Sequence, residues 1–167
     1  MSFPPFGWRP ASAADLGALA ALYRDAALQL GPLVYTREQT AAWAAVPDDA
    51  PQFRRYVLEA DTWVAERASD FAVLGFCGVS FDGALREVRS LYVAPLATRQ
   101  GLGGEMLRRT LQRAEAAGAR RFAAWVTPLS RPLFLRAGFT WTQTFTEPFA
   151  GVEFERYRVE RSSESTP

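Results

Sequence analysis

The stretch that decides the fold is Leu91-Tyr-Val-Ala-Pro-Leu-Ala-Thr-Arg-Gln-Gly-Leu-Gly-Gly104. Its first residues read as the end of a strand, and Pro95 ends the strand because proline has no amide hydrogen for a ladder. Glycines at 101, 103 and 104 follow, and a helical apolar pattern begins immediately. A glycine-rich turn that opens a helix presents free amides and the positive end of the helix dipole. The stretch therefore predicts an anion-binding loop, suited to a pyrophosphate.

Two common phosphate-binding motifs do not fit this loop. A dinucleotide-binding fingerprint needs a third glycine where this chain has Met106, and no acidic residue ends a strand at the required distance. A Walker loop needs a lysine, and the chain has none. A coenzyme A pyrophosphate site remains, beside the alternative that the glycines serve only a tight turn between strand and helix.

Three helices and four strands are expected before the loop. A strand at 7–9 precedes a helix that starts at the capping box Ser12 to Asp15 and ends after Leu30, and further helices start at Thr36 and at Asp48 or Asp49. Strands follow at 61–67, 71–81 and 85–94. Asp82-Gly83 is a strong hairpin signal between the last two. Within 85–94 the apolar residues switch from even-numbered to odd-numbered positions, which predicts a bulge near Arg89-Ser90.

The loop leads into a helix that ends at Gly118, then a strand at 122–127, a short helix at 130–137 and strands at 139–146 and 152–160. Residues 161–167 are polar, and we expect a disordered tail. The order of elements predicts one α/β domain over 1–160, with a mixed, largely antiparallel sheet flanked by helices.

The composition of the 167 residues excludes several classes of protein. Without histidine there is no Ser-His-Asp triad and no HExxH zinc site, and without lysine there is no pyridoxal Schiff base. The net charge of +1 does not suggest a nucleic-acid partner. The single Cys77 cannot form an intramolecular disulfide.

The location of the protein is also an expectation from the sequence. The longest apolar run, 71–79, is far shorter than the roughly 18 residues that span a bilayer. The first residues lack the basic and apolar segments of a signal peptide. We therefore expect no membrane association, a cytoplasmic location and no metal site.

Three segments together carry a family resemblance. Leu91-Tyr-Val-Ala-Pro95, the loop Ala97 to Gly103 and Leu133-Phe-Leu-Arg-Ala-Gly-Phe139 resemble the GNAT N-acetyltransferase superfamily. The resemblance is strong over 73–139, and Tyr35-x-x-Glu-Gln39-x-x-x-Trp43 is similar to a group of bacterial members. It implies a six- to seven-stranded sheet and acetyl-CoA as the cosubstrate.

The resemblance also implies which residues bind the coenzyme. The backbones of Leu91 and Val93 would pair with the pantetheine arm, and amides in the loop would hold the pyrophosphate. Three positions depart from the family's pattern. Thr98 stands where the family has Arg or Gln, and Thr127 stands where it often has Asn. Phe134 stands where it commonly has a Tyr that protonates the leaving thiolate. The implied coenzyme-binding residues are Leu91, Tyr92, Val93, Arg99, Gln100, Gly101, Leu102, Gly103, Gly104, Thr127 and Phe134.

Transfer of the acetyl group needs an acceptor and groups that move protons. The resemblance implies an acetyl transfer to a primary amine of a small molecule or peptide, by direct attack on the thioester. An alkylammonium at pH 7 must lose a proton. Glu87 is the first candidate base, unless it only pairs with Arg86 or Arg89, and Glu66 is the second.

Tyr92 is the second candidate catalytic residue, as a proton donor or as a wall of the acceptor pocket, and an amide near Val93 would bind the thioester oxygen. An acyl-CoA-binding sensor or partner-binding module with little catalysis is the alternative function. A homodimer is a further expectation from the family.

Overall fold

The computed structural model describes residues 5–81 and 83–163, which form a seven-stranded sheet with the order β1-β2-β3-β4-β5-β7-β6. β4 and β5 pair in parallel, and every other neighbouring pair is antiparallel. The strands are β1 (Phe6–Pro10), β2 (Asp61–Arg67), β3 (Val73–Val79), β4 (Leu85–Val93), β5 (Arg121–Val126), β6 (Thr140–Phe149) and β7 (Val152–Ser162). The predicted mixed sheet is confirmed.

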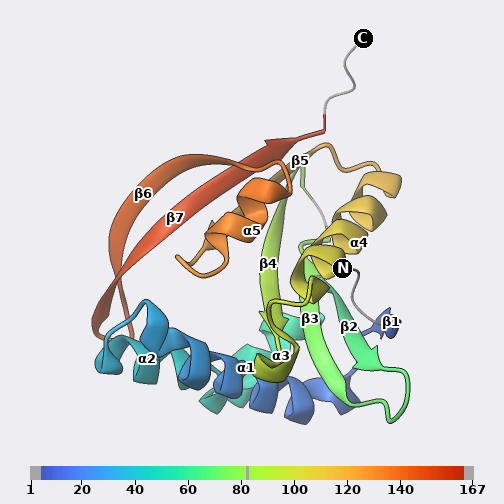
Figure 1. The fold of residues 1–167 in the computed structure, drawn as a ribbon. Coiled ribbons are helices and arrows are strands. Elements are labelled where there is room, and N and C mark those ends of the chain that lie inside the picture. The colour runs from blue at the N-terminus through green and yellow to red at the C-terminus, as the bar shows by residue number, and fades with distance from the viewer. Residues whose placement is uncertain (1–4, 82, 164–167) are drawn as a thin grey trace.

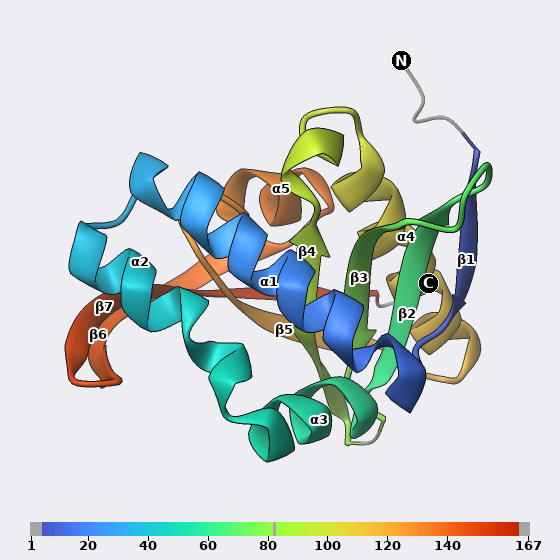
Figure 2. The ribbon, with the colours of Figure 1, turned by 90° about the horizontal axis from the view of Figure 1, so that it is seen from below.

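Helices cover both faces of this sheet (Figure 1). They are α1 (Leu16–Leu30), α2 (Arg37–Ala44), α3 (Ala50–Leu58), α4 (Leu102–Ala116) and α5 (Arg131–Arg136). Figure 2 shows α1, α2 and α3 on one face, with α4 and α5 behind the sheet on the other. Each face has its own core: Leu19 and Phe53 pack against Phe76 on the first, and Met106 and Leu107 lie with Phe122 on the second. Burial of these side chains supplies most of the free energy that favours the fold.

Side-chain caps start the first three helical segments where the sequence predicts. The Ser12 amide donates to the Asp15 carboxylate at 2.7 Å, which closes the capping box before α1. Before α2, the Gln39 amide donates to the Thr36 hydroxyl at 3.1 Å. Caps of this kind satisfy amides that the first helical turn leaves without partners.

The predicted bulge in β4 is confirmed by the register with β3. Gly78 faces Ser90 and Val79 faces Val88, so Arg89 is an extra residue in β4. The Arg89 carbonyl accepts a hydrogen bond from the Tyr56 hydroxyl at 2.8 Å, which ties the bulge to α3. β3 and β4 form the predicted antiparallel pair, although Asp82 of the hairpin signal lies outside the described residues.

The end of the last strand corrects one prediction. β7 continues to Ser162, so the expected disorder is wrong for 161–163; residues 164–167 and the first four residues lie outside the described part. The reason is pairing: Arg161 lies opposite Phe122 of β5 and forms an ion pair with Glu115 at 3.2 Å. A terminal segment becomes ordered when it is tied into a sheet. No helix within 5–81 or 83–163 is both long enough and apolar enough to cross a bilayer.

Candidate active site

The site begins where β4 and β5 separate. These strands pair only from Leu85 to Val88 of β4, and β5 then continues beside β7 alone. The Ala94 amide donates to Leu74 of β3 at 2.8 Å. Since amides alternate in direction along a strand, those of Leu91 and Val93 point away from β3, toward the gap. This half of β4 therefore offers a free backbone edge to a ligand.

The loop at the end of β4 adds a second set of free backbone groups. A 3₁₀ turn at Pro95–Ala97 leads to Arg99 and Gly101, whose φ angles are 61° and 89°. The first hydrogen bond of α4 runs from the Glu105 amide to the Gly101 carbonyl at 3.1 Å. Within the described part of the chain, the amides of 99–104 donate to no acceptor. Together with the dipole of α4 they form a site for an anion.

Two positions of the loop, 103 and 104, are glycine for different structural reasons. A Cβ at Gly103 would lie 2.9 Å from the Cδ1 of Leu133, so this glycine lets the segment around α5 approach α4 closely. A Cβ at Gly104 would meet nothing within 4 Å. Gly104 therefore leaves open space beside the free amides, as a bound diphosphate requires.

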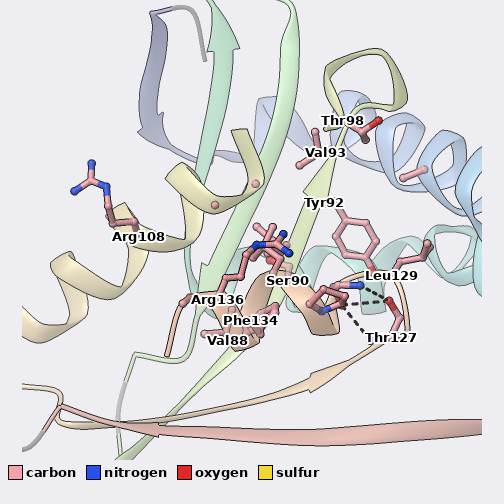
Figure 3. A pocket seen from close by; sticks show the side chains of 18 of the residues that line it. Val88, Ser90, Tyr92, Val93, Thr98, Arg108, Thr127, Leu129, Phe134 and Arg136 are labelled. Carbon is pink, nitrogen blue, oxygen red and sulfur yellow. Dashed lines mark hydrogen bonds between the residues drawn. The ribbon is translucent and has the colours of Figure 1, made fainter. Parts of the chain in front are cut away.

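A cavity of about 1060 Å³ joins the strand edge to the loop (Figure 3). Figure 3 shows Arg108 of α4 toward one side of the cavity and Tyr92 and Leu129 toward the other. Most of the residues predicted to bind the coenzyme line this cavity: Leu91, Tyr92, Val93, Arg99, Gly101, Gly103, Gly104, Thr127 and Phe134. Gln100 and Leu102 do not line it, since the Gln100 side chain donates to the Leu96 carbonyl and Leu102 is buried in the core. Both contribute only their amides to the loop.

Thr127 and Ser130 form a small polar turn on the β5 side of the cavity. The two hydroxyls lie 3.2 Å apart, and each accepts from the other residue's amide, at 3.1 Å and 3.2 Å. The remaining hydroxyl proton of this pair can serve a ligand, so Thr127 can donate where the family often has Asn. Sequence analysis missed Ser130, although its spacing from Thr127 is typical of such turns.

Phe134 is buried and leaves the cavity without a proton donor at its position. Its ring packs against Phe139 with a centroid distance of 5.1 Å, and only 3% of its surface is exposed. The departure from the family's tyrosine is therefore a real chemical difference in the site.

Tyr92 is a polar residue on the free half of β4, and it lines the cavity. Its ring stacks between Tyr23 and Phe76, with centroid distances of 4.4 Å and 5.2 Å, and burial raises the pKa of its hydroxyl. The indole nitrogen of Trp43 donates to that hydroxyl at 3.3 Å. Because an indole N–H only donates, the Tyr92 oxygen accepts from it. The hydroxyls of Tyr23 and Tyr56 are further hydrogen-bond partners of Tyr92. The sequence leaves Trp43 open as a wall of an acceptor pocket or as core packing of the N-terminal helices, and does not predict this hydrogen bond.

The two predicted bases lie away from the cavity lining. Glu87 stands on β4 before the strands separate and forms no ion pair with Arg86 or Arg89 within the described residues. Glu66 lies on β2, where its carboxylate accepts from the Arg9 guanidinium at 3.0 Å. Neither carboxylate lines the cavity. The role of Glu87 as a base stays a prediction.

Arginines give the cavity a positive character. Arg99 and Arg136 line it, and their guanidiniums have no acceptor within the described residues. Arg108 also lines it but is held by Glu105 at 2.6 Å. Free guanidiniums beside free amides suit the phosphate groups of a nucleotide.

The family model described as "Acetyltransferase (GNAT) family" matches residues 28–139, about two thirds of the chain. The chain belongs to the GNAT acetyltransferase family. It is therefore an acyltransferase, and acetyl-CoA is the acyl donor of the family. The matched range contains the free strand edge, the loop and α5, so the family motif and the cavity coincide.

Solved structures with the GNAT fold resemble this chain over nearly its whole length. A GCN5-related N-acetyltransferase from Rhodopseudomonas palustris is 23% identical, with a TM-score of 0.86 over 97% of this chain and 98% of that one. The PaiA N-acetyltransferase from Thermoplasma acidophilum, in complex with coenzyme A, is 16% identical, with a TM-score of 0.76 over 95% and 99%. A phosphinothricin acetyltransferase from Sinorhizobium meliloti, in complex with acetyl-CoA, is 24% identical, with a TM-score of 0.69 over 94% and 88%. No curated protein sequence matches the chain. The predicted homodimer and cytoplasmic location stay predictions.

Proposed function

We propose that the protein transfers the acetyl group of acetyl-CoA to a primary amine of a small molecule or peptide, by direct attack of the amine on the thioester. The observation that carries this proposal is the continuity between the free amides of 99–104 and the free edge of β4, along one cavity. A diphosphate and an extended amide-containing chain need these two kinds of partner in this order.

The residues of the chain have separate roles in this proposal. The loop amides hold the pyrophosphate, and the backbones of Leu91 and Val93 pair with the pantetheine arm. The thioester then lies beside Tyr92, with the Val93 amide as the donor to its oxygen. Holding both reactants in this cavity supplies much of the acceleration, because a reaction between two molecules becomes a reaction within one complex.

The chemical step exchanges the carbon–sulfur bond of the thioester for a carbon–nitrogen bond. The amine nitrogen forms a bond to the thioester carbonyl carbon, the carbon–sulfur bond breaks and the sulfur leaves as a thiolate, and the proton that the nitrogen loses passes to water. A thiol pKa of roughly 8.5 makes the thiolate a tolerable leaving group without an acid at position 134. The Tyr92 side chain lines the cavity and is the candidate to supply a proton to the sulfur.

Coenzyme titration and thiol release test this function together. Calorimetry with acetyl-CoA is expected to detect binding, and a panel of amines is expected to include acceptors that release free thiol. Absence of binding would contradict the assignment of the loop. Binding without thiol release for any amine would instead favour the sensor module, for which Phe134 is the supporting observation.

A further inference from the structure

Resting on the proposed function, we propose that the acceptor is a weakly basic amine carried on an apolar body, and that it binds as the neutral amine. This names the class of substrate for the same cavity. The lining of the cavity beyond Tyr92 and the placement of its charged groups carry the proposal.

The cavity has an apolar arm on the side of α1 and α2. We define it by six lining residues: Ala26, Leu30, Leu33, Trp43, Tyr92 and Leu129. Ala26 is buried, with 3% of its surface exposed, whereas Leu33 is 70% exposed. The arm therefore runs from a closed end inside the molecule to a mouth at Leu33. Its walls match an aliphatic or aromatic body and offer hydrogen bonds only at Tyr92 and the backbone.

No group that readily accepts a proton lines this arm within the described residues. The cavity's lining holds one carboxylate, Glu115, which is paired with Arg161 at 3.2 Å. Glu115 is on the last turn of α4, about 20 Å along the helix from the loop at 1.5 Å per residue. Tyr92 holds its proton because burial raises its pKa. An ammonium that enters the arm consequently has no side chain to deprotonate it.

The basicity of the amine then decides how much of it can react without such a group. At pH 7 about a tenth of an α-amino group is neutral, compared with less than one in a thousand of an alkylamine such as a lysine side chain. An α-amino group therefore reaches the thioester in the neutral, nucleophilic form far more often than an alkylamine does.

Matched amines test the proposal through the pH dependence of kcat/KM. L-Phenylalaninamide and 2-phenylethylamine share an apolar body and differ in basicity, while glycinamide keeps the weak base and loses the body. We expect L-phenylalaninamide to exceed 2-phenylethylamine about 100-fold at pH 7, with a gap that closes as the pH rises to 10 and both amines become neutral. We expect glycinamide to be about 10-fold poorer than L-phenylalaninamide throughout, since it does not fill the arm.

A variant pair tests the arm itself. Leu33→Glu places a carboxylate at its mouth and is expected to raise kcat/KM for 2-phenylethylamine relative to L-phenylalaninamide about 10-fold, because the carboxylate attracts the ammonium and can accept its proton. Leu28→Glu is the control: Leu28 is also an exposed leucine, on α1, but does not line the cavity. Equal effects of the two variants would overturn the arm as the acceptor site.

Other outcomes separate this inference from the proposed function. Equal kcat/KM for the two phenyl amines at pH 7 would overturn the substrate class and leave acetyl transfer standing. If kcat/KM rises with pH in the natural chain and this rise is lost in Glu87→Gln, Glu87 is the base. That result would also overturn the inference. Coenzyme binding without thiol release for any amine would overturn the proposed function, and the inference with it.

Discussion

At the scale of single residues, the site depends on the hydrogen bonds that hold the Tyr92 hydroxyl. Trp43 donates to its oxygen, and the hydroxyls of Tyr23 and Tyr56 are its other hydrogen-bond partners. Trp43→Phe keeps an aromatic ring against Tyr23 and Tyr92 but removes this donor. We expect kcat to fall about 5-fold, the cost of one hydrogen bond near 1 kcal/mol, with an unchanged coenzyme Kd. Steady-state kinetics and calorimetry measure the two quantities separately.

A matched tryptophan provides the control for this prediction. The Trp63 indole also makes a side-chain hydrogen bond, to Asp61 at 2.8 Å, but Trp63 lies on β2 and does not line the cavity. Trp63→Phe should leave kcat unchanged. Equal losses in the two variants would show that Trp43 supports only the general packing of the protein.

At this scale, residues inside one motif can be predicted from the sequence. Contacts between residues that are distant in the chain cannot. Tyr92 and Thr127 could be proposed because they occupy positions that the family motif defines. The partner of Tyr92 could not, since Trp43 is 49 residues away in the sequence and meets it only through the packing of α1 and α2 against β4. Glu87 shows the reverse case, because it is the first candidate base in the sequence while its place on β4 before the strands separate keeps it out of the cavity lining.

At the scale of elements, the start of α4 carries the coenzyme site. Gly104→Leu adds a side chain to the open space beside the free amides, and its Cβ meets no other atom within 4 Å. We expect the coenzyme Kd to rise at least about 10-fold, because the side chain occupies the volume of the diphosphate. Gly17→Leu is the control, since Gly17 is also in the first turn of a helix with nothing within 4 Å of an added Cβ. An unchanged Kd in Gly104→Leu would contradict the loop assignment.

The junction of β1 with α1 predicts a dependence of stability on pH. Asp15 accepts two hydrogen bonds from Arg9, at 2.8 Å and 2.9 Å, and these lower its pKa from 3.8 to about 2. The ionised form is therefore favoured in the folded state. Its contribution, up to about 2 kcal/mol, is present above pH 4 and is lost as the pH falls toward 2.

Asp15→Asn tests this linkage by urea denaturation across pH. We expect the variant to be less stable than the natural chain by up to about 2 kcal/mol at pH 7, and the difference to shrink below pH 4. A constant difference at all pH values would assign the loss to the cap of α1 rather than to the charge of Asp15.

The elements themselves were largely readable from the sequence, for local reasons. Capping residues such as Thr36 mark helix starts, and a slip in apolar phase marked the bulge at Arg89. The separation of β4 from β5 was not readable, since it depends on the partner that β5 takes beyond Ala124. The order of β7 past Glu160 was missed for the same reason, because a polar strand end becomes ordered only through its neighbours.

At the scale of the whole molecule, the cavity and the β1–α1 junction are separate. The cavity is built around β4, β5, α4 and α5, whereas Asp15 joins α1 to β1 and to Arg9 at the other end of the sheet order. Perturbations at sites without shared partners usually add. The effect of a ligand on stability should therefore survive damage to the junction.

Thermal unfolding with coenzyme makes this a quantitative prediction. A ligand at 100 times its Kd stabilises the folded state by about 2.7 kcal/mol, or about 5–10 °C in Tm for a chain of this size. We expect this increment in the natural chain. Asp15→Asn should start from a lower Tm and show the same increment at the same multiple of Kd. At that fixed coenzyme concentration Gly104→Leu should lose at least about half of it, because the concentration is then at most about 10 times its Kd. An increment that vanishes in Asp15→Asn would mean that the junction and the cavity are coupled through the sheet.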